Sequence, residues 1–259
     1  MRAADSLLEI DGLELRAGRR TFVRALSMKV RAGEVWCVLG ANGAGKTTFL
    51  ESIVGLRAPC SGSIRLAGRP LDQWTAREAA RKRAFLPQKV HDSFSASVME
   101  VVLLGRHPHM SRWGWEGDGE VKIARSALME VGLSDMADRD ITTLSGGERQ
   151  RAAIAALIAQ ETPLLILDEP VAHVDLHHQR VILGRLHQMA KERNHAVVMS
   201  VHDANLVAQY ASHVMIFHGN GRVDCGEAAK ILNEEALSVA LKCRISRVDV
   251  GARSVFLAA

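Results

Sequence analysis

A glycine-rich turn near residue 40 constrains the fold more than any other feature of this 259-residue chain. Residues 40–47 read GANGAGKT and fit the pattern G-x-x-x-x-G-K-[ST]. The apolar run at 34–40, EVWCVLG, predicts a buried strand before the turn, and residues 46–56 predict a helix after it. This order of strand, turn and helix is the context that the pattern requires. The sequence therefore predicts an α/β fold with a mainly parallel sheet.

The turn itself predicts a phosphate site. Three glycines leave the backbone free to direct successive N–H groups at one anion, and the start of the helix adds its positive end. Lys46 would neutralise phosphate charge, and the hydroxyl of Thr47 suits Mg²⁺, which prefers oxygen ligands. A plain glycine-rich turn is the alternative. The expected nucleotide-binding residues are Gly40, Ala41, Asn42, Gly43, Ala44, Gly45, Lys46, Thr47 and Thr48.

Two carboxylates follow a second predicted strand. Residues 164–169 read LLILDE, so four apolar residues place Asp168 and Glu169 at the carboxyl end of a buried strand. We expect Asp168 to hold Mg²⁺ and Glu169 to act as general base toward an attacking water. The alternative is a strand that ends in a solvated acidic turn. Together with the glycine-rich turn, the pair favours hydrolysis of a nucleoside triphosphate.

A third motif narrows the family, because kinases and GTPases share the first two. Residues 144–150, LSGGERQ, resemble the signature of the ABC ATPases. Ser145, Gly146, Gly147 and Glu148 would begin a helix whose free N–H groups can face a γ-phosphate, with an ordinary capped helix start as the alternative. The resemblance implies an ATPase that uses ATP and Mg²⁺. It also implies a dimer with a second copy, in which each ATP lies between the glycine-rich loop of one chain and the signature of the other.

The resemblance implies roles for three single residues. Gln88 would contact the metal together with Thr47 and Asp168, Asp175 would lie in the loop between the two chains, and His202 would contact the γ-phosphate. The catalytic residues implied are Glu169, His202 and Lys46. In proteins of this family, a helix begins near the positions of His173, His177 and His178. This argues against a metal site formed by these three histidines.

Two segments depart from the family pattern. Ala17 stands where many relatives carry an aromatic residue that stacks on adenine. We therefore expect a relaxed preference among nucleotides, with Val23 covering the edge of the base. Residues 171–174 read VAHV where relatives have Thr-Ser-Ala-Leu, so the loop between the two chains is expected to differ in its fine geometry.

The whole chain, 1–259, reads as one domain. Residues 7–30 predict an antiparallel N-terminal β subdomain, and the more charged section at about 89–160 predicts a helical insert. Further helices are predicted at 75–83, 121–131 and 179–191, and a further strand at 196–201. The expected fold class is α/β, of the P-loop NTPase type of ABC ATPases, with a mainly parallel core.

Composition excludes several classes. The 33 basic and 29 acidic residues are interspersed and leave a net charge of +4, so nucleic acid is not an expected partner. Residues 1–10 do not read as an export signal. The most apolar stretch, 152–167, is too short and too interrupted for a membrane span. The cysteines stand singly, which predicts reduced thiols at Cys37, Cys60, Cys225 and Cys243.

Two strings narrow the resemblance further. Residues 97–109, SVMEVVLLGRHPH, and 175–179, DLHHQ, resemble the ABC importers of iron chelates, haem and cobalamin. The resemblance implies two membrane permease subunits, a periplasmic binding protein and a place on the cytoplasmic face of the bacterial inner membrane. Residues 246–259 are most similar to the cobalamin members. The permease is expected to dock on the insert, and the candidate contact residues are Phe94, Val98, Met99 and Trp113. The alternative is that these four side chains only pack the core of the insert.

Two other functions stay open on the sequence alone. An ABC exporter ATPase carries the same three motifs. A DNA-repair type of ABC ATPase would need long coiled-coil heptads between the first motif and the signature, and this chain has only residues 48–143 there. A neighbouring gene for a periplasmic binding protein would favour the importer.

Overall fold

The computed structural model describes residues 6–88, 95–110, 117–172, 174–193, 195–250 and 253–258. Its central sheet consists of β3 (Val35–Gly40), β6 (Arg83–Leu86), β7 (Leu164–Leu167), β8 (Ala196–Ser200), β9 (His213–Phe217) and β10 (Val223–Glu227). Their order is β10-β9-β3-β8-β7-β6. The β9–β10 pair is antiparallel and the other four pairs are parallel. The sheet is therefore mainly parallel, as the sequence predicts.

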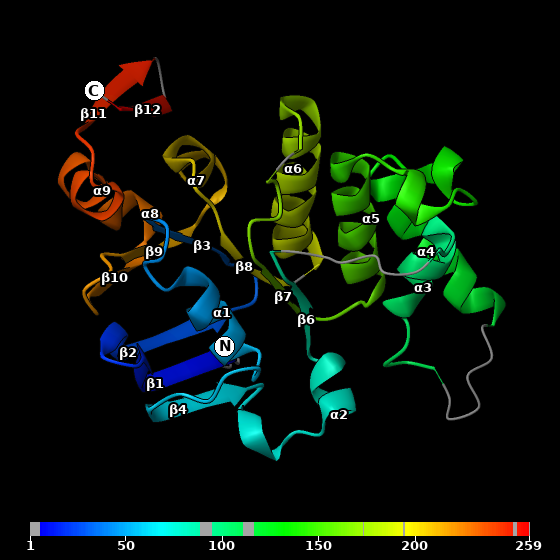
Figure 1. The fold of residues 1–259 in the computed structure, drawn as a ribbon, viewed down its shortest axis with the longest axis horizontal. Helices are drawn as coiled ribbons and strands as arrows, with labels where there is room; N and C mark the ends of the chain where they lie inside the picture. Colours follow the sequence, from blue (N-terminus) through cyan, green and yellow to red (C-terminus); the bar gives the residue numbers. More distant parts are fainter. Residues whose placement is uncertain are drawn as a thin grey trace.

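A second, antiparallel sheet is built mostly from the N-terminal residues. It consists of β1 (Ser6–Ala17), β2 (Arg20–Arg31), β4 (Ser61–Leu66) and β5 (Arg69–Pro70), in the order β2-β1-β4-β5. A separate hairpin of β11 (Ile245–Val250) and β12 (Arg253–Ala258) lies near the C-terminus, at the far side of the molecule from the N-terminal sheet (Figure 1). The antiparallel N-terminal subdomain is thus confirmed.

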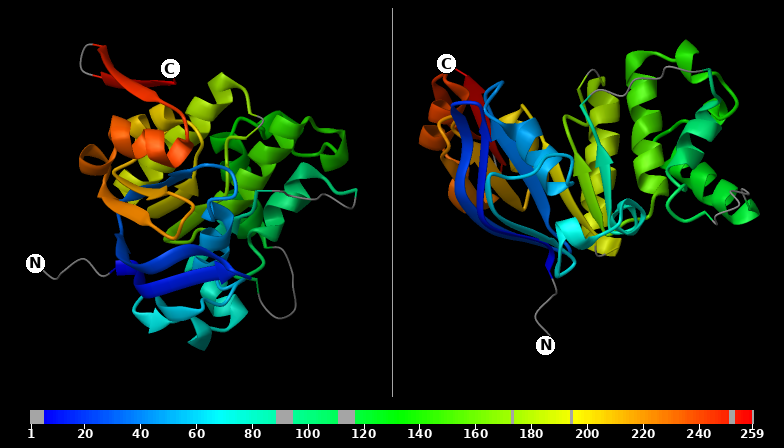
Figure 2. Two further views of the ribbon diagram at one scale, coloured as in Figure 1. Left: turned by 60° about the vertical axis from the view of Figure 1, so that its left-hand side comes forward. Right: turned by 60° about the horizontal axis from the view of Figure 1, so that its bottom comes forward.

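Helices lie in two groups. The first group comprises α1 (Lys46–Ile53), α6 (Leu176–Arg193), α7 (Ala204–Tyr210), α8 (Ala228–Ile231) and α9 (Glu234–Leu241), which come after central strands in the chain, and α2 (Ala76–Ala80), which precedes β6. The second group, α3 (Val98–Leu104), α4 (Asp118–Glu130) and α5 (Gly146–Ala159), packs together to one side of the sheet (Figures 1 and 2). This second group contains the helices expected of the insert, while its boundaries at about 89 and 160 stay a prediction.

Alternation along the central strands divides the core into two layers. On β3, Val35, Cys37 and Leu39 face a cluster formed with α3 to α7, whereas Trp36 and Val38 face a cluster formed with α1 and the antiparallel sheet. Both faces of the sheet are covered, which explains why its strands read as continuous apolar runs. The loops at the carboxyl ends of the parallel strands carry the polar residues singled out above.

Several element boundaries differ from the sequence expectations. The helix expected at 46–56 ends at Ile53, and Gly55 follows with a φ of 82°. The helix expected at 75–83 covers only Ala76–Ala80, because the chain enters β6 at Arg83. Helix α6 is longer than 179–191 at both ends. In the part of the chain that the structure describes, no helix has the length and apolar character to cross a membrane.

The residues of the insert that were expected to dock the permease differ in their burial. Val98 is fully buried in the core of the insert, so its proposed place on a docking surface is wrong, and core packing explains it. Met99 is half-buried and packs against the same cluster. Phe94 and Trp113 lie outside the described residues. Leu104, at the end of α3, is 70% exposed and is the apolar side chain of this helix most open to contact.

Candidate functional site

The glycine-rich loop connects β3 to α1 in a conformation that requires glycine. Gly40 has a φ of 151°, and a Cβ there would lie 2.6 Å from the carbonyl oxygen of Phe217 on the neighbouring strand. Gly45 has a φ of 109°, and a Cβ there would lie 2.6 Å from the Cβ of Phe22. Side chains at these positions would therefore both strain the backbone and collide with β9 or β2. The loop can wrap closely around an anion because both glycines are present.

Lys46 begins α1 and folds back over this loop. Its Nζ donates to the carbonyl oxygens of Gly40, at 2.8 Å, and Ala41, at 3.3 Å. Burial lowers the pKa of Lys46, while the carboxylates of Glu169 and Asp168 act in the opposite direction. The ammonium group is thus held at the centre of the loop, where it can neutralise phosphate charge.

Thr47 and Asp168 form the oxygen pair predicted for a magnesium ion. The hydroxyl of Thr47 donates to Oδ2 of Asp168 at 2.6 Å, although 121 positions separate the two residues in the chain. Asp168 is fully buried at the end of β7, and its backbone N–H donates to Leu86 on β6. A hydroxyl and a carboxylate side by side are hard oxygen donors that fit Mg²⁺. Gln88, two residues after β6, lines a hollow together with Thr47.

Glu169 and His202 meet at the carboxyl ends of two adjacent parallel strands. His202 Nε2 lies 2.5 Å from Glu169 Oε1, and since an ionised carboxylate only accepts, the ring nitrogen donates. Glu169 has a φ of 52°, a left-handed conformation that is uncommon for a residue with a side chain. Its backbone N–H donates to the hydroxyl of Ser200 at 2.8 Å. Ser200 was not anticipated from the sequence, where it reads as one more position in a buried strand.

The glycine-rich loop, Thr47, Gln88 and Glu169 line one hollow of about 380 Å³ at the carboxyl ends of the parallel strands. The hollow is lined by Arg20, Phe22, Asn42, Gly43, Gly45, Lys46, Thr47, Thr48, Gln88 and Glu169. Ala41 and the buried Gly40 and Ala44 shape the loop behind it. A larger hollow of about 660 Å³ lies between α7, α8 and the C-terminal hairpin, but it lacks the phosphate loop and the carboxylates.

The residue expected to cover the nucleobase does not lie at this hollow. Val23 is fully buried in the core beneath β2, so its predicted contact with a nucleobase is wrong. Because side chains alternate along a strand, its neighbour Phe22 faces the hollow instead. The guanidinium of Arg20 lies 5.1 Å from the centre of the Phe22 ring. Ala17, which pairs with Arg20 at the end of the β1–β2 hairpin, is exposed.

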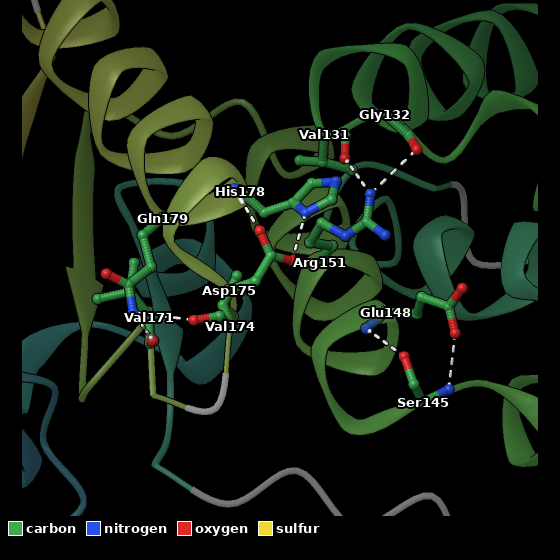
Figure 3. Close-up of polar contacts among 10 residues, drawn as sticks. All are labelled: Val131, Gly132, Ser145, Glu148, Arg151, Val171, Val174, Asp175, His178 and Gln179. Atoms are coloured by element: carbon green, nitrogen blue, oxygen red, sulfur yellow. Dashed lines mark hydrogen bonds and ion pairs between the residues drawn. The ribbon is translucent and has the colours of Figure 1, made fainter.

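The signature lies apart from this hollow within one chain. Ser145 caps α5, its hydroxyl accepts the backbone N–H of Glu148, and the Glu148 carboxylate accepts the N–H of Ser145 at 2.7 Å (Figure 3). Ser145 and Gly146 are exposed, and Gly147 and Glu148 are half-buried. Neither Ser145 nor its helix start lines the hollow of the glycine-rich loop. The motif is therefore an exposed helix N-terminus open to an anion from outside the chain.

Asp175 caps the start of α6 (Figure 3). Its carboxylate accepts the backbone N–H of His178 at 3.0 Å and the ring N–H of His178 Nδ1 at 2.6 Å. These contacts, the backbone one first, lower the pKa of Asp175 to about 2. Gln179 Nε2 closes the preceding loop by donating to the carbonyl oxygens of Val171, at 3.3 Å, and Val174, at 2.9 Å. Val171 and Val174 are thus tied to α6.

The histidines near this loop do not form a metal cluster in the described residues, where no group of three His, Cys, Asp or Glu side chains could hold an ion. His178 is the partner of Asp175, and His173 falls outside the described residues. Gln150, from the signature segment, links α5 to the loop after β7 by donating to the carbonyl oxygen of Pro170 at 3.1 Å. The start of α5 therefore connects physically to the residue that follows Glu169.

Comparison with known proteins agrees with this geometry. Residues 23–172 match the family described as ABC transporter. The chain is 42% identical over 217 residues to the hemin import ATP-binding protein HmuV of Gloeobacter violaceus, covering 81% of this chain and 78% of that protein. It is 35% identical over 240 residues to the cobalamin import ATP-binding protein BtuD of Halobacterium salinarum, covering 92% of this chain but only 60% of that protein.

Among solved structures, an inward-facing ABC transporter of the metal-chelate type is similar to this chain, with a TM-score of 0.86, 27% identity and 98% of both chains covered. This similarity extends beyond the segment that matches the family, to the helices and the hairpin near the C-terminus. The fold class expected from the sequence is thus confirmed, and the chain belongs to the ABC transporter family.

Proposed function

We propose that this chain is the ATP-hydrolysing subunit of an importer for cobalamin or an iron chelate such as a siderophore or haem. The observation that carries the proposal is the hollow that gathers the phosphate loop, Thr47 and Glu169, with the buried Asp168 in contact with Thr47 and His202 in contact with Glu169. Relatives named for hemin and cobalamin import supply the direction and class of cargo.

Hydrolysis divides among residues already in place. The N–H groups of the loop and Lys46 bind and orient the triphosphate, and Thr47 and Asp168 would hold Mg²⁺ with Gln88 nearby. When bound, Mg²⁺ neutralises charge that develops on the phosphate oxygens. Glu169 takes the proton of the attacking water, and His202 donates a hydrogen bond that orients this carboxylate or the γ-phosphate.

A second copy of the chain completes the site. The exposed start of α5 at Ser145 and Gly146 and the neighbouring Asp175 lie outside the hollow, so they are free to meet a nucleotide held by the other copy. ATP would close this dimer and hydrolysis would open it. Two permease subunits, a periplasmic binding protein and a position at the cytoplasmic face of the inner membrane follow from the importer assignment.

Cargo is the part of the proposal that uptake must decide. We would delete the gene in the source cells and measure uptake of labelled cobalamin, a ferric siderophore and haem, each under limitation for that nutrient. Complementation with the natural chain should restore uptake, and a Lys46→Ala chain expressed at the same level should not, because it lacks the charge that binds the phosphates. The C-terminal residues 246–259 predict that cobalamin uptake falls. Unchanged uptake of all three would contradict import and favour an exporter.

A further inference from the structure

Ser200 is the last residue of β8 and lies next to Asp168 and Glu169. No role was assigned to it from the sequence. Its side chain is fully buried. Its Oγ lies 2.5 Å from Asp168 Oδ1 and 2.8 Å from the backbone N of Glu169. One hydroxyl therefore touches both the residue expected to hold Mg²⁺ and the residue expected to activate water.

Hydrogen-bond chemistry fixes the direction of these two contacts. The N–H of Glu169 can only donate, so the hydroxyl oxygen accepts it. The ionised Asp168 carboxylate can only accept, so the single hydroxyl proton of Ser200 points to it. The hydroxyl therefore donates one hydrogen bond and accepts another at the same time. An alanine side chain can do neither, and a thiol does both only weakly.

The two contacts join the halves of the site into one chain. Thr47 donates to Oδ2 of Asp168 at 2.6 Å, and Ser200 donates to the other oxygen, so the carboxylate is fixed from both sides. Ser200 also holds the N–H of Glu169, whose φ of 52° must be maintained for its side chain to reach His202 at 2.5 Å. Without this anchor, the backbone could relax and move the carboxylate away from the water.

We propose that Ser200 is a positioning residue that couples the metal-holding carboxylate Asp168 to the general base Glu169 and so sets the rate of ATP hydrolysis. The proposal rests on the proposed function of this chain as an ATPase. Ser200 does not line the hollow and need not touch ATP. Its loss should therefore affect turnover far more than nucleotide binding.

The test compares Ser200→Ala, Ser200→Cys and Ser200→Thr in the full-length chain. We would measure kcat and KM for ATP, the Kd for ATP with Mg²⁺ under conditions without turnover, and the Mg²⁺ concentration that gives half-maximal hydrolysis. For Ser200→Ala we expect kcat to fall by roughly ten- to hundredfold and the Mg²⁺ requirement to rise, with the Kd for ATP nearly unchanged. Ser200→Cys should behave similarly because a thiol is a weak donor, and Ser200→Thr should recover turnover because it keeps the hydroxyl.

Ser212→Ala is the matched control. The Ser212 hydroxyl also accepts a backbone N–H, that of Val35 at 2.9 Å, but at the opposite end of the parallel strands. The Ser212→Ala substitution should lower the melting temperature of the chain without changing kcat. Unchanged kcat in both Ser200→Ala and Ser200→Cys would overturn the proposal, as would equal losses in kcat and ATP affinity. If the natural chain itself shows no ATP hydrolysis, the proposed function fails instead, so the two failures are distinguishable.

Discussion

Glu169→Gln gives the most direct test of the proposed chemistry. The amide has the length and shape of the carboxylate but cannot take a proton from water. The backbone N–H that Ser200 accepts is unchanged, as is the φ of 52°, so the variant should fold normally. General base catalysis contributes roughly 10²- to 10⁴-fold. We therefore expect kcat to fall at least about 100-fold, which corresponds to ~2.7 kcal/mol of transition-state stabilisation.

Binding should survive this change, since the loop and Lys46 still hold the triphosphate. The variant should accumulate as an ATP-bound dimer, which light scattering after size-exclusion chromatography would detect as a doubled mass with ATP and a monomer without it. Steady-state phosphate release measures the loss of turnover.

Glu161→Gln is a suitable control for the same substitution. Glu161 also has a left-handed φ, 51°, but its side chain contacts Arg106 on the insert and lies outside the hollow. We expect turnover at the natural rate and no dimer trapping by ATP. Undiminished hydrolysis by Glu169→Gln would remove Glu169 from the role of general base, whatever the control shows.

Three further perturbations test other parts of the structure. Phe22→Ala should weaken ATP binding about fivefold in calorimetry, because one stacking contact is worth ~1 kcal/mol, and unchanged affinity would place the base elsewhere. Gly105→Ala should destabilise the chain by ~1–3 kcal/mol in thermal unfolding, because a Cβ would overlap the carbonyl oxygen of Ala156, whereas Gly119→Ala, in open space, should not. Met99→Glu should abolish uptake and spare ATP binding by the free subunit; loss of both would show that Met99 only packs the insert.

The phosphate loop and the acidic strand end were predictable because their information is local. Residues 40–47 and 164–169 each combine a buried apolar run with a fixed short spacing. Parallel pairing of β3 and of β7 with the strand between them, β8, places the carboxyl ends of all three at one edge, which brings Asp168 to Thr47 across 121 positions. A fold class and two motifs were therefore sufficient to anticipate that Thr47 and Asp168 lie together, whereas their role in holding Mg²⁺ stays a prediction.

The base-facing residue was not predictable in the same way. The pairing of β1 with β2 shifts register near Leu13, Leu15 and Arg16, and such irregularities break the simple alternation from which a face is read. The resemblance placed Val23 at the edge of the base, but Val23 points into the core and Phe22 faces the hollow. Ser200 escaped for a different reason, since a single hydroxyl in an apolar strand has the same sequence pattern whether it packs or positions.

The signature was recognised from its sequence, but only the fold shows that its N–H groups lie apart from the glycine-rich loop of the same chain. An α-helix leaves its first N–H groups without partners in the helix. The capping box of Ser145 and Glu148 satisfies the N–H of Glu148, whereas Gly146 and Gly147 precede it in the first turn and carry no side chain that could shield an approaching anion. This exposed end lies outside the hollow that holds Lys46. We therefore expect one chain to bind ATP in its own hollow and to present the signature to a nucleotide held by another copy, which is the arrangement proposed for dimer closure.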